Sequence, residues 1–539
     1  MAGGGTSSQP LSSARRKNLA GKSGWAGLVE NRRVFVMAVF ASLGGLLYGY
    51  NQGVFSGVLG MRNFDDAMGN AVTDSGKKGW LVSILELGAW LGVLLTGYIA
   101  DKISRKYAVV VAVIVFCIGV IVQTTAHASP SIYGGRFVTG LGVGSLSMVV
   151  PLYNSEISPP EVRGSLVALQ QLAITFGIMI SFWIDYGTNY IGGTGATQSE
   201  AAWRIPLALQ LVPALFLGIG ILWMPFSPRW LVNQGRNDEA LAVLSRVRGQ
   251  SSDSEVVQIE YLEIQAQYLF EKETLENKFP QYQDGSFSSD FKLGFFAYFT
   301  MDRQVYFRFY LESIFQKLGL TGNTISLLAT GVVGILMFLA TIPAVLWIDK
   351  LGRRPILISG AFVMAICHFI VAILTGLYQN SWPDHVAAGW VACVFVWIFA
   401  IGFGYSWGPS AWVIVAEIWP LSVRGKGLSI AASSNWMNNF IVGQVTPTML
   451  QHIGFGTFVF FGAFSLMGGL FVLFFVPETK GRTLEEMEEV FSDSAKIALE
   501  DQARLDAIYK RLGLHDASTT EKNDIEDKAA EDRISNSVE

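Results

Sequence analysis

The sequence predicts an all-α membrane protein built from two related halves of nominally six membrane-spanning helices each. Its composition is the first observation, because 51% of the 539 residues are hydrophobic and only 15% are charged, whereas about a quarter of the residues of an average soluble domain are charged. Apolar segments recur from Val34 to Pro477, each near the roughly 20 residues that cross a hydrocarbon core. Short motifs also repeat between the two parts of the chain.

Eleven apolar segments are candidate spans. They lie near 34–57, 79–100, 107–127, 132–153, 165–187, 205–225, 324–348, 355–377, 387–415, 427–450 and 455–476. Short polar joints separate most of them. The long exception is 226–300, which separates the sixth span from the rest.

Basic residues set the orientation of the spans, because Lys and Arg near span ends stay in the cytoplasm. Six of them precede the first span, so the N-terminus is predicted to be cytoplasmic: Arg15, Arg16, Lys17, Lys22, Arg32 and Arg33. Basic residues also follow the second, fourth and sixth spans, whereas the opposite joints are nearly bare. No short apolar region precedes Val34, so no cleavable signal peptide is expected.

The chain offers little for other classes of chemistry. Cys117, Cys367 and Cys393 all lie inside apolar segments, so packing is expected rather than an extracellular disulfide framework. No nucleophile–base pair, metal-ligand spacing or phosphate loop accompanies the spans. The sequence therefore predicts neither an enzyme nor a cofactor or metal site.

An internal repeat points to transport. "EISPPEVRG" at Glu156–Gly164 matches "EIWPLSVRG" at Glu417–Gly425, and "DKISRK" at Asp101–Lys106 matches "DKLGRR" at Asp349–Arg354. Each pair occurs in the same order, after the second and fourth span of its half. Such repeats are typical of secondary transporters, whose substrate site lies near the midplane between the halves.

The repeated motifs also predict a latch. An acid at the end of one span, followed by a basic cluster, makes charge-assisted contacts that hold one conformation until the halves rock apart. The positive-inside rule alone explains the basic residues but leaves the acids unexplained. The candidate latch residues are Asp101, Arg105, Lys106, Glu156, Arg163, Arg229, Asp349, Arg353, Arg354, Glu417 and Arg424.

These motifs resemble the fungal branch of the sugar porter family of the major facilitator superfamily. The matches cover most of 34–490 and include "GGLLYGYNQG", "GYIADKISRK", "GRFVTGLGVG", "PLYNSEISPPEVRG", "PFSPRWLVNQGR", "DKLGRR", "WGPSAWVIVAEIWPLSVRG" and "VPETKGRTLEE". The resemblance implies the major facilitator fold with a central substrate cavity. The implied regions are a cytoplasmic tail at 1–33, a half at 34–225, a cytoplasmic helical linker at 226–300, a half at 301–477 and a cytoplasmic tail at 478–539.

The resemblance also implies the sugar contacts, which map onto Gln171, Trp412, Asn435, Trp436 and Asn439. Amides supply donors and acceptors for hydroxyls, and an indole offers an apolar face with a donor at its edge. Two alternatives stay open: a helix–helix hydrogen bond for Gln171, and simple packing for Trp436.

Two positions bear on proton coupling. The proton-coupled members carry an Asp where this chain has Asn51, and an amide does not take up and release a proton. Passive carriers of the family share the Asn, so the resemblance favours facilitated diffusion. Arg136 is the only formal charge in its span and is a functional candidate, with a snorkelling anchor as the alternative. The chain also departs from the family at Phe226, Met337 and Gly404.

The seventh span is expected to be shortened. The family's paired glutamines are absent from "DRQVYFRFYLESIFQKLGLTGN" at 302–323, which instead carries Asp302, Arg303, Arg308 and Glu312. Central charges cost roughly 2.5–3.5 kcal/mol each on the insertion scale. We expect a short, tilted or broken helix over about 295–316, reflecting either the natural protein or an error in the gene sequence.

Together these features predict a plasma-membrane protein, monomeric and with both termini cytoplasmic, that moves a hexose or pentose by alternating access. Its partners would be the sugar and the lipid bilayer, and no nucleic acid is expected. The polar tail after Val490 contains no recognisable signalling motif. The alternatives are a non-transporting sugar receptor with the same fold, and a transporter of another polyol or a sugar acid.

Overall fold

The computed structural model describes residues 24–69, 74–278, 323–378, 381–417, 424–478, 504 and 507–513. The chain divides into two compact units. The larger unit comprises Ser23–Ser227 and Phe287–Val490, and the smaller comprises Met1–Lys22, Pro228–Ser286 and Phe491–Glu539. Each unit is described by itself below.

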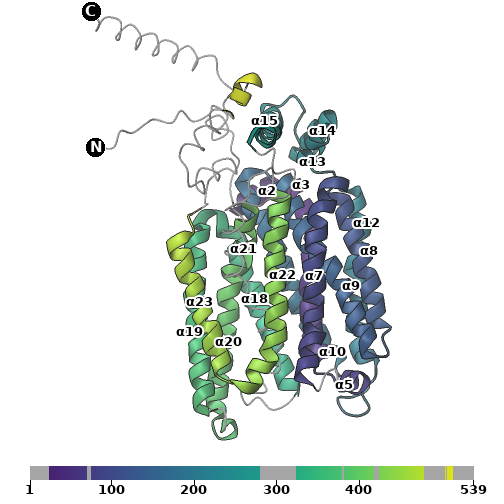
Figure 1. Cartoon of the computed structure of the whole chain (residues 1–539), viewed down its shortest axis with the longest axis vertical. Coiled ribbons are helices and arrows are strands. Elements are labelled where there is room, and N and C mark those ends of the chain that lie inside the picture. The colour runs from purple at the N-terminus through teal and green to yellow at the C-terminus, as the bar shows by residue number, and fades with distance from the viewer. Residues whose placement is uncertain are drawn as a thin grey trace, which may run out of the picture. The chain divides into compact units, whose positions relative to one another are not determined.

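The larger unit begins with the helices of the N-terminal half. They are α2 (Gly24–Glu30), α3 (Arg32–Ala41), α4 (Leu43–Val58), α5 (Arg62–Met68), α7 (Ser75–Ile103), α8 (Arg105–Thr124), α9 (Ser129–Ile157), η1 (Pro160–Val162), α10 (Arg163–Thr188), α11 (Ala201–Leu209), α12 (Leu211–Gly220) and η2 (Ile221–Trp223). The long helices of this half run side by side (Figure 1). Helix α9 packs against both α7 and α8, and α10 packs against α4.

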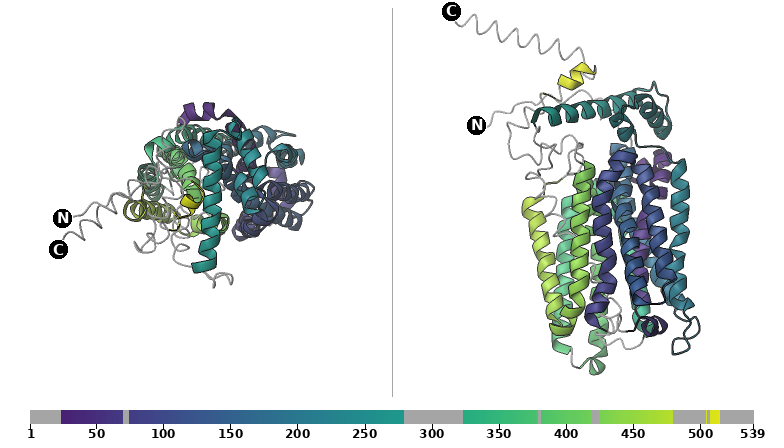
Figure 2. Two further views of the ribbon diagram at one scale, coloured as in Figure 1. Left: turned by 90° about the horizontal axis from the view of Figure 1, so that it is seen from above. Right: turned by 45° about the vertical axis from the view of Figure 1, so that its right-hand side comes forward.

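The C-terminal half repeats this arrangement. Its described helices are α18 (Asn323–Leu351), α19 (Arg353–Tyr378), η4 (Trp382–Asp384), α20 (Val386–Tyr405), α21 (Trp407–Glu417), α22 (Arg424–His452) and α23 (Gly456–Phe475). Two helix pairs join the halves: α22 packs against α7, and α18 packs against α10. Figure 2 shows α7 and α22 adjacent from a second direction.

The prediction of an all-α membrane protein is confirmed. Within the described residues, ten helical segments are long and apolar enough to cross a membrane. Among the described residues, three predicted spans are interrupted: α3 and α4 share the first, α11 and α12 share another, and α20 and α21 share a third. The predicted span 427–450 lies in α22, which has 29 residues but is not one of the ten. Its many Ser, Asn and Gln side chains explain why its hydropathy is low.

The repeated joints have a similar, positive φ in both halves. Ser104, between α7 and α8, has a φ of 88°, and Gly352, between α18 and α19, has a φ of 93°. A glycine adopts this region readily, whereas a residue with a Cβ atom is strained there. The sequence match of the two motifs therefore reflects a shared joint geometry, with strain only in the N-terminal half.

The smaller unit is helical in its described part. It contains α13 (Pro228–Asn233), α14 (Asn237–Arg248) and α15 (Glu255–Lys278). A bidentate ion pair holds α14 to α15, with Arg248 Nε at 2.7 Å and Nη2 at 2.5 Å from the carboxylate oxygens of Glu260. Ile508 and Tyr509 from the C-terminal tail pack with Ala266 and Phe270 of α15. Residues 507–513 thus share an apolar cluster with the linker.

Three predictions fall outside the described part of the chain. The shortened seventh helix, expected over about 295–316, lies within the gap between 278 and 323. The side chains of Glu417 and Arg424, at the ends of α21 and α22, are not described either. The roles of all three stay predictions.

Candidate functional site

A set of buried amides on α22 and α10 forms the core of the candidate site. The side chains of Asn435 and Asn439 are fully buried in α22. Neither the nitrogen nor the oxygen of either amide has a hydrogen-bond partner among the described residues. Gln171, buried in α10, likewise has no partner for its Nε2 within those residues. Buried amides left unpaired are costly, so the set is suited to a polar ligand.

Gln171 lies at the contact between the two halves. A Cβ atom added to Gly408 of α21 would lie 2.9 Å from Gln171 Nε2. Trp412 follows Gly408 by one helical turn on the same face of α21 and is buried. Trp412 thus lies one turn along α21 from the glycine next to Gln171, and the shared role of the two side chains in sugar binding stays a prediction.

Trp436 makes a hydrogen bond and a ring contact with other residues of the protein. Its Nε1 donates a hydrogen bond to Ser147 Oγ of α9 at 3.0 Å, and its ring lies 4.8 Å from the ring of Tyr48, centroid to centroid. The side chain is fully buried. In this conformation the geometry favours packing between the halves, the alternative that the sequence had left open.

Asn51 ties the first span to the sixth. Its Nδ2 donates a short hydrogen bond to Oε1 of Gln210, which lies between α11 and α12 and donates from Nε2 to the backbone oxygen of Leu207 at 3.1 Å. The neighbouring Tyr50 hydroxyl donates to the backbone oxygen of Pro206 at 3.0 Å. Position 51 is therefore held by an amide–amide pair.

Arg136 is fully buried and makes contacts that a snorkelling anchor would not. Its Nε donates to the backbone oxygen of Leu81 at 2.8 Å, and its Nη2 donates to that of Val82 at 3.0 Å. The guanidinium lies over the Phe55 ring, 3.6 Å from the centroid. A buried charge inside the membrane region is expensive, so Arg136 stays a functional candidate.

Within the N-terminal half, two acids predicted as latch residues pair with Arg105. Its Nη2 lies 2.9 Å from Glu156 Oε1, and its Nη1 lies 3.2 Å from Asp101 Oδ1. The neighbouring Lys106 donates to the backbone oxygen of Leu222 at 2.6 Å and lies 5.0 Å from the ring centroid of Phe226. Phe226, where the chain departs from the family it resembles, offers the lysine an aromatic face.

A second set of contacts joins the two halves. Asp349, near the end of α18, accepts from the backbone N–H of Ser165 at 3.0 Å and from its hydroxyl at 2.8 Å. Arg353 Nη2 donates to the other oxygen of Asp349 at 3.0 Å. Helix α10 receives no capping bond from its own preceding residue, Val162, so Asp349 caps it from the other half. A Cβ atom at Gly164 would lie 2.1 Å from Asp349 Oδ1, so glycine is needed there.

The remaining latch candidates take different places. Arg354 Nη2 donates to the backbone oxygen of Leu473, and Arg163 is the first residue of α10. Arg229 lies on α13, in the smaller unit.

Sequence reasoning missed three residues of these clusters. Glu478 accepts from the backbone N–H groups of Arg353 at 2.9 Å and Arg354 at 3.1 Å, and so caps α19. Ser165 and Gln210 pair with residues that the sequence had singled out. An amide inside the apolar segment 205–225 and an acid directly after the last span were the available signals.

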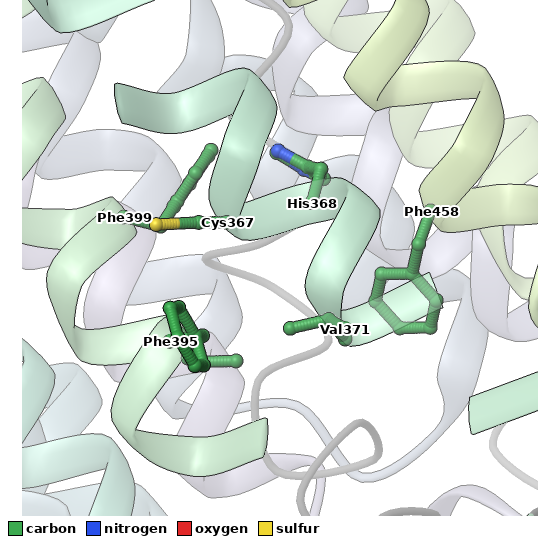
Figure 3. A pocket seen from close by; sticks show the side chains of 7 residues that line it. Cys367, His368, Val371, Phe395, Phe399 and Phe458 are labelled. Carbon is green, nitrogen blue, oxygen red and sulfur yellow. The ribbon is translucent and has the colours of Figure 1, made fainter. Parts of the chain in front are cut away.

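A small apolar pocket lies elsewhere, between α19, α20 and α23 (Figure 3). His368 is buried at its edge, with Nδ1 2.9 Å from the backbone oxygen of Met364. The ring of Phe399 packs edge-on against the imidazole at 4.4 Å between centroids. With Val371, Phe458 and Cys367 also lining it, the pocket lacks the polar groups of the amide cluster.

Comparisons with known proteins agree with these features. The family described as "Sugar (and other) transporter" matches residues 37–491. The MFS glucose transporter mfs1 of Aspergillus flavus is 34% identical over 506 residues, covering 89% of this chain and 94% of that protein. The high-affinity fructose transporter ght6 of Schizosaccharomyces pombe is 33% identical over 478 residues, covering 86% and 87%.

A solved structure supports the fold. The proton:xylose symporter XylE of E. coli, bound to 6-bromo-6-deoxy-D-glucose, superposes with a TM-score of 0.75 at 27% identity, covering 86% of this chain and 99% of that chain. The predicted resemblance to fungal sugar porters is confirmed, and so is the major facilitator fold. This chain is a multi-pass membrane protein and belongs to the sugar (and other) transporter family.

Proposed function

We propose that this protein carries a monosaccharide, a hexose or a pentose, across the plasma membrane by alternating access. The observation that supports this best is the set of buried amides of Gln171, Asn435 and Asn439. Among the described residues, Gln171 Nε2 and both amide atoms of each asparagine have no hydrogen-bond partner. They come from both halves, as a substrate site between two rocking bodies requires.

The chemistry of these side chains matches a sugar. Each amide offers donors and acceptors, so one amide can bind two neighbouring hydroxyls. Trp412, one helical turn after the glycine next to Gln171, can offer an apolar face to the C–H surface of a pyranose ring. The cluster contains no formal charge, which favours a neutral sugar over a sugar acid.

The contact of Asp349 with Ser165 supports a gate between the halves on the side of the basic joints. Both of its hydrogen bonds are charge-assisted, the stronger class, and both cross from one half to the other. Opening that side separates α10 from α18 and breaks both bonds at once. Sugar binding between the halves would have to offset this cost before release to the cytoplasm.

The basic joints favour cytoplasmic N- and C-termini, and in this proposal the protein acts as a monomer and not as an enzyme. Asn51 carries no coupling proton, because its amide does not titrate and its Nδ2 is committed to Gln210.

The test is counterflow in liposomes that contain the purified protein, with a panel of hexoses, pentoses, a polyol and a sugar acid. Exchange of labelled hexose or pentose, with little exchange of the polyol or the acid, is the expected result. Saturable sugar binding without any exchange would instead favour the receptor alternative. Exchange of the sugar acid alone would show that the assigned substrate class is wrong.

A further inference from the structure

Glu86 is a buried acid that the proposed sugar site and latch do not use. It is the only formal charge in the segment 79–100, lies in the middle part of α7 and is fully buried. An ionisable side chain within a membrane-spanning helix is costly and marks a functional position. Its surroundings indicate what that function is.

One side of Glu86 faces the other half of the protein. Ser83 Oγ donates to Gln444 Oε1 at 3.1 Å, and Ser429 Oγ donates to the backbone oxygen of Val93 at 3.0 Å. Helix α22 therefore covers the stripe of α7 between these contacts (Figure 1). At 3.6 residues per turn, Ser83, Glu86 and Val93 fall within about 80° of the helix circumference. Glu86 thus belongs to the stripe that faces α22.

Its depth along α7 is close to that of the amide cluster. The two helices run antiparallel, because residue numbers on α22 fall as those on α7 rise between the two contacts. Glu86 lies on α7 between Ser83 and Val93, whose partners on α22 are Gln444 and Ser429. Even spacing between these two contacts brings Glu86 within about one helical turn of the level of Asn439.

The flank toward α9 holds Arg136. Its guanidinium donates to the backbone oxygen of Val82, four residues before Glu86. Side chains on a helix lean toward its N-terminus, so the Glu86 carboxyl leans toward the level of that carbonyl. Along α7 the acid therefore lies within about one helical turn of the carbonyl that the guanidinium binds.

Few other charged or titratable groups occur on the helices packed against α7, which are α9, α22 and α8. Besides Arg136, α9 carries Tyr133 near its first residue, and Tyr153 and Glu156 near its last. The described side chains of α22 include none before His452. On α8, Arg105, Lys106 and Tyr107 lie in the first turn, and Cys117 further along.

Building on the transport function proposed above, we propose that Glu86 carries a coupling proton, in place of the acid that Asn51 lacks. Facing the outside, the Glu86 carboxylate takes up one proton, and Arg136 keeps its bonds to the Leu81 and Val82 carbonyls. After the halves rock, the proton leaves to the cytoplasm and the carboxylate again balances the Arg136 charge. One proton enters with each sugar, which replaces the facilitated diffusion that position 51 alone had favoured.

The first test needs no sugar. Infrared difference spectra of the purified protein between acidic and alkaline buffer should contain a protonated-carboxyl band that disappears in Glu86→Gln. The same band should persist in Asp185→Asn, which removes another fully buried acid of this half. Spectra of Glu86→Gln that match those of the unmodified protein would overturn the proposal.

The second test uses liposomes. With the outside one pH unit more acidic, one proton per sugar allows about tenfold accumulation. We expect accumulation near that limit in the unmodified protein and in Asp185→Asn, and none in Glu86→Gln, whose counterflow persists. Glu86→Asp, which keeps a carboxyl, should still accumulate sugar and serves if Glu86→Gln does not fold. Exchange without accumulation in the unmodified protein, or accumulation by Glu86→Gln, would refute the proposal. Absence of all exchange would refute the transport function instead, and the infrared result would then decide the role of Glu86.

Discussion

The carboxylate of Asp349 accepts hydrogen bonds from both the backbone N–H and the hydroxyl of Ser165, 184 positions away in the sequence. One oxygen of an acid in the C-terminal half thereby caps the first turn of α10 in the N-terminal half. The N-terminus of a helix carries partial positive charge, which a carboxylate stabilises. The contact therefore favours the conformation in which the two halves are closed at this end.

The first prediction removes the charge of this cap. Asp349→Asn keeps the shape but loses charge-assisted bonds that are worth about 2 kcal/mol, so the open population should rise by about 30-fold. The measurement is the alkylation rate of a cysteine introduced at Ala168, one turn into α10, in a background without Cys117, Cys367 and Cys393. Asp101→Asn is the matched control, because Asp101 pairs with Arg105 inside one half. Equal rates in the two variants would show that the cap does not hold the halves together.

The second prediction concerns the strained joint. Ser104 has a φ of 88° and a ψ of 157°, a region used almost only by glycine, at a cost of about 1–3 kcal/mol. Its hydroxyl makes only a long capping contact of 3.4 Å with the Tyr107 N–H. Ser104→Gly should therefore raise the melting temperature of the purified protein.

The opposite change is its control. At Gly352, which has the same φ sign, an added Cβ atom would lie 2.6 Å from Glu478 Oε2. Gly352→Ser should lower the melting temperature through both strain and this clash. A lower melting temperature for Ser104→Gly would mean that its capping contact outweighs the strain.

A third prediction separates the two tryptophans. Trp436→Phe loses the bond to Ser147 and should cost about 1 kcal/mol of stability, with little change in sugar affinity. Trp412→Phe should weaken sugar binding more than it lowers stability, because Trp412 is one of the proposed sugar contacts. Thermal melts and sugar titrations of both variants check this, and a larger loss of affinity in Trp436→Phe would reverse the assignment.

The fourth prediction concerns the segment with the expected shortened span. Insertion of a family-like apolar segment after Phe307 should raise both surface expression and hexose uptake, because the present charges oppose spanning. Expression of the two versions in a yeast strain without hexose transporters makes the comparison. Equal uptake by the unmodified chain would show that the site is complete without the insertion.

The fold could be predicted from the sequence, because membrane spans are long apolar segments and short matching motifs identify the repeat of the two halves. The low hydropathy of α22 shows the limit of this signal. Its Asn and Ser side chains lower the average, yet the helix is long and packs between the halves. An apolar average describes a helix in contact with lipid better than one that carries a polar face inward.

The partners within the site could not be predicted. Trp436 pairs with Ser147 across 289 positions, and Asn51 pairs with Gln210 across 159. The sequence identifies an amide or an indole as costly inside a membrane, but its partner depends on helix crossing and rotation. Glu86 was visible as a lone acid in an apolar segment, and only the packing of α7 between α9 and α22 relates it to Arg136.

The central claim is that the buried amides of Asn435, Asn439 and Gln171, which have amide atoms without a hydrogen-bond partner among the described residues, bind the sugar. The measurement that tests it most directly is sugar affinity by counterflow in liposomes for Asn439→Ala and Gln171→Ala against Asn438→Ala. Asn438 is the matched control, because its amide already donates to the backbone oxygen of Ser434 at 2.9 Å. Each lost bond is worth about 0.5–1.5 kcal/mol, so the first two variants should bind sugar about 2- to 10-fold more weakly at unchanged membrane abundance, and the control should match the unmodified protein. Unchanged affinity in both Asn439→Ala and Gln171→Ala would contradict the proposed site.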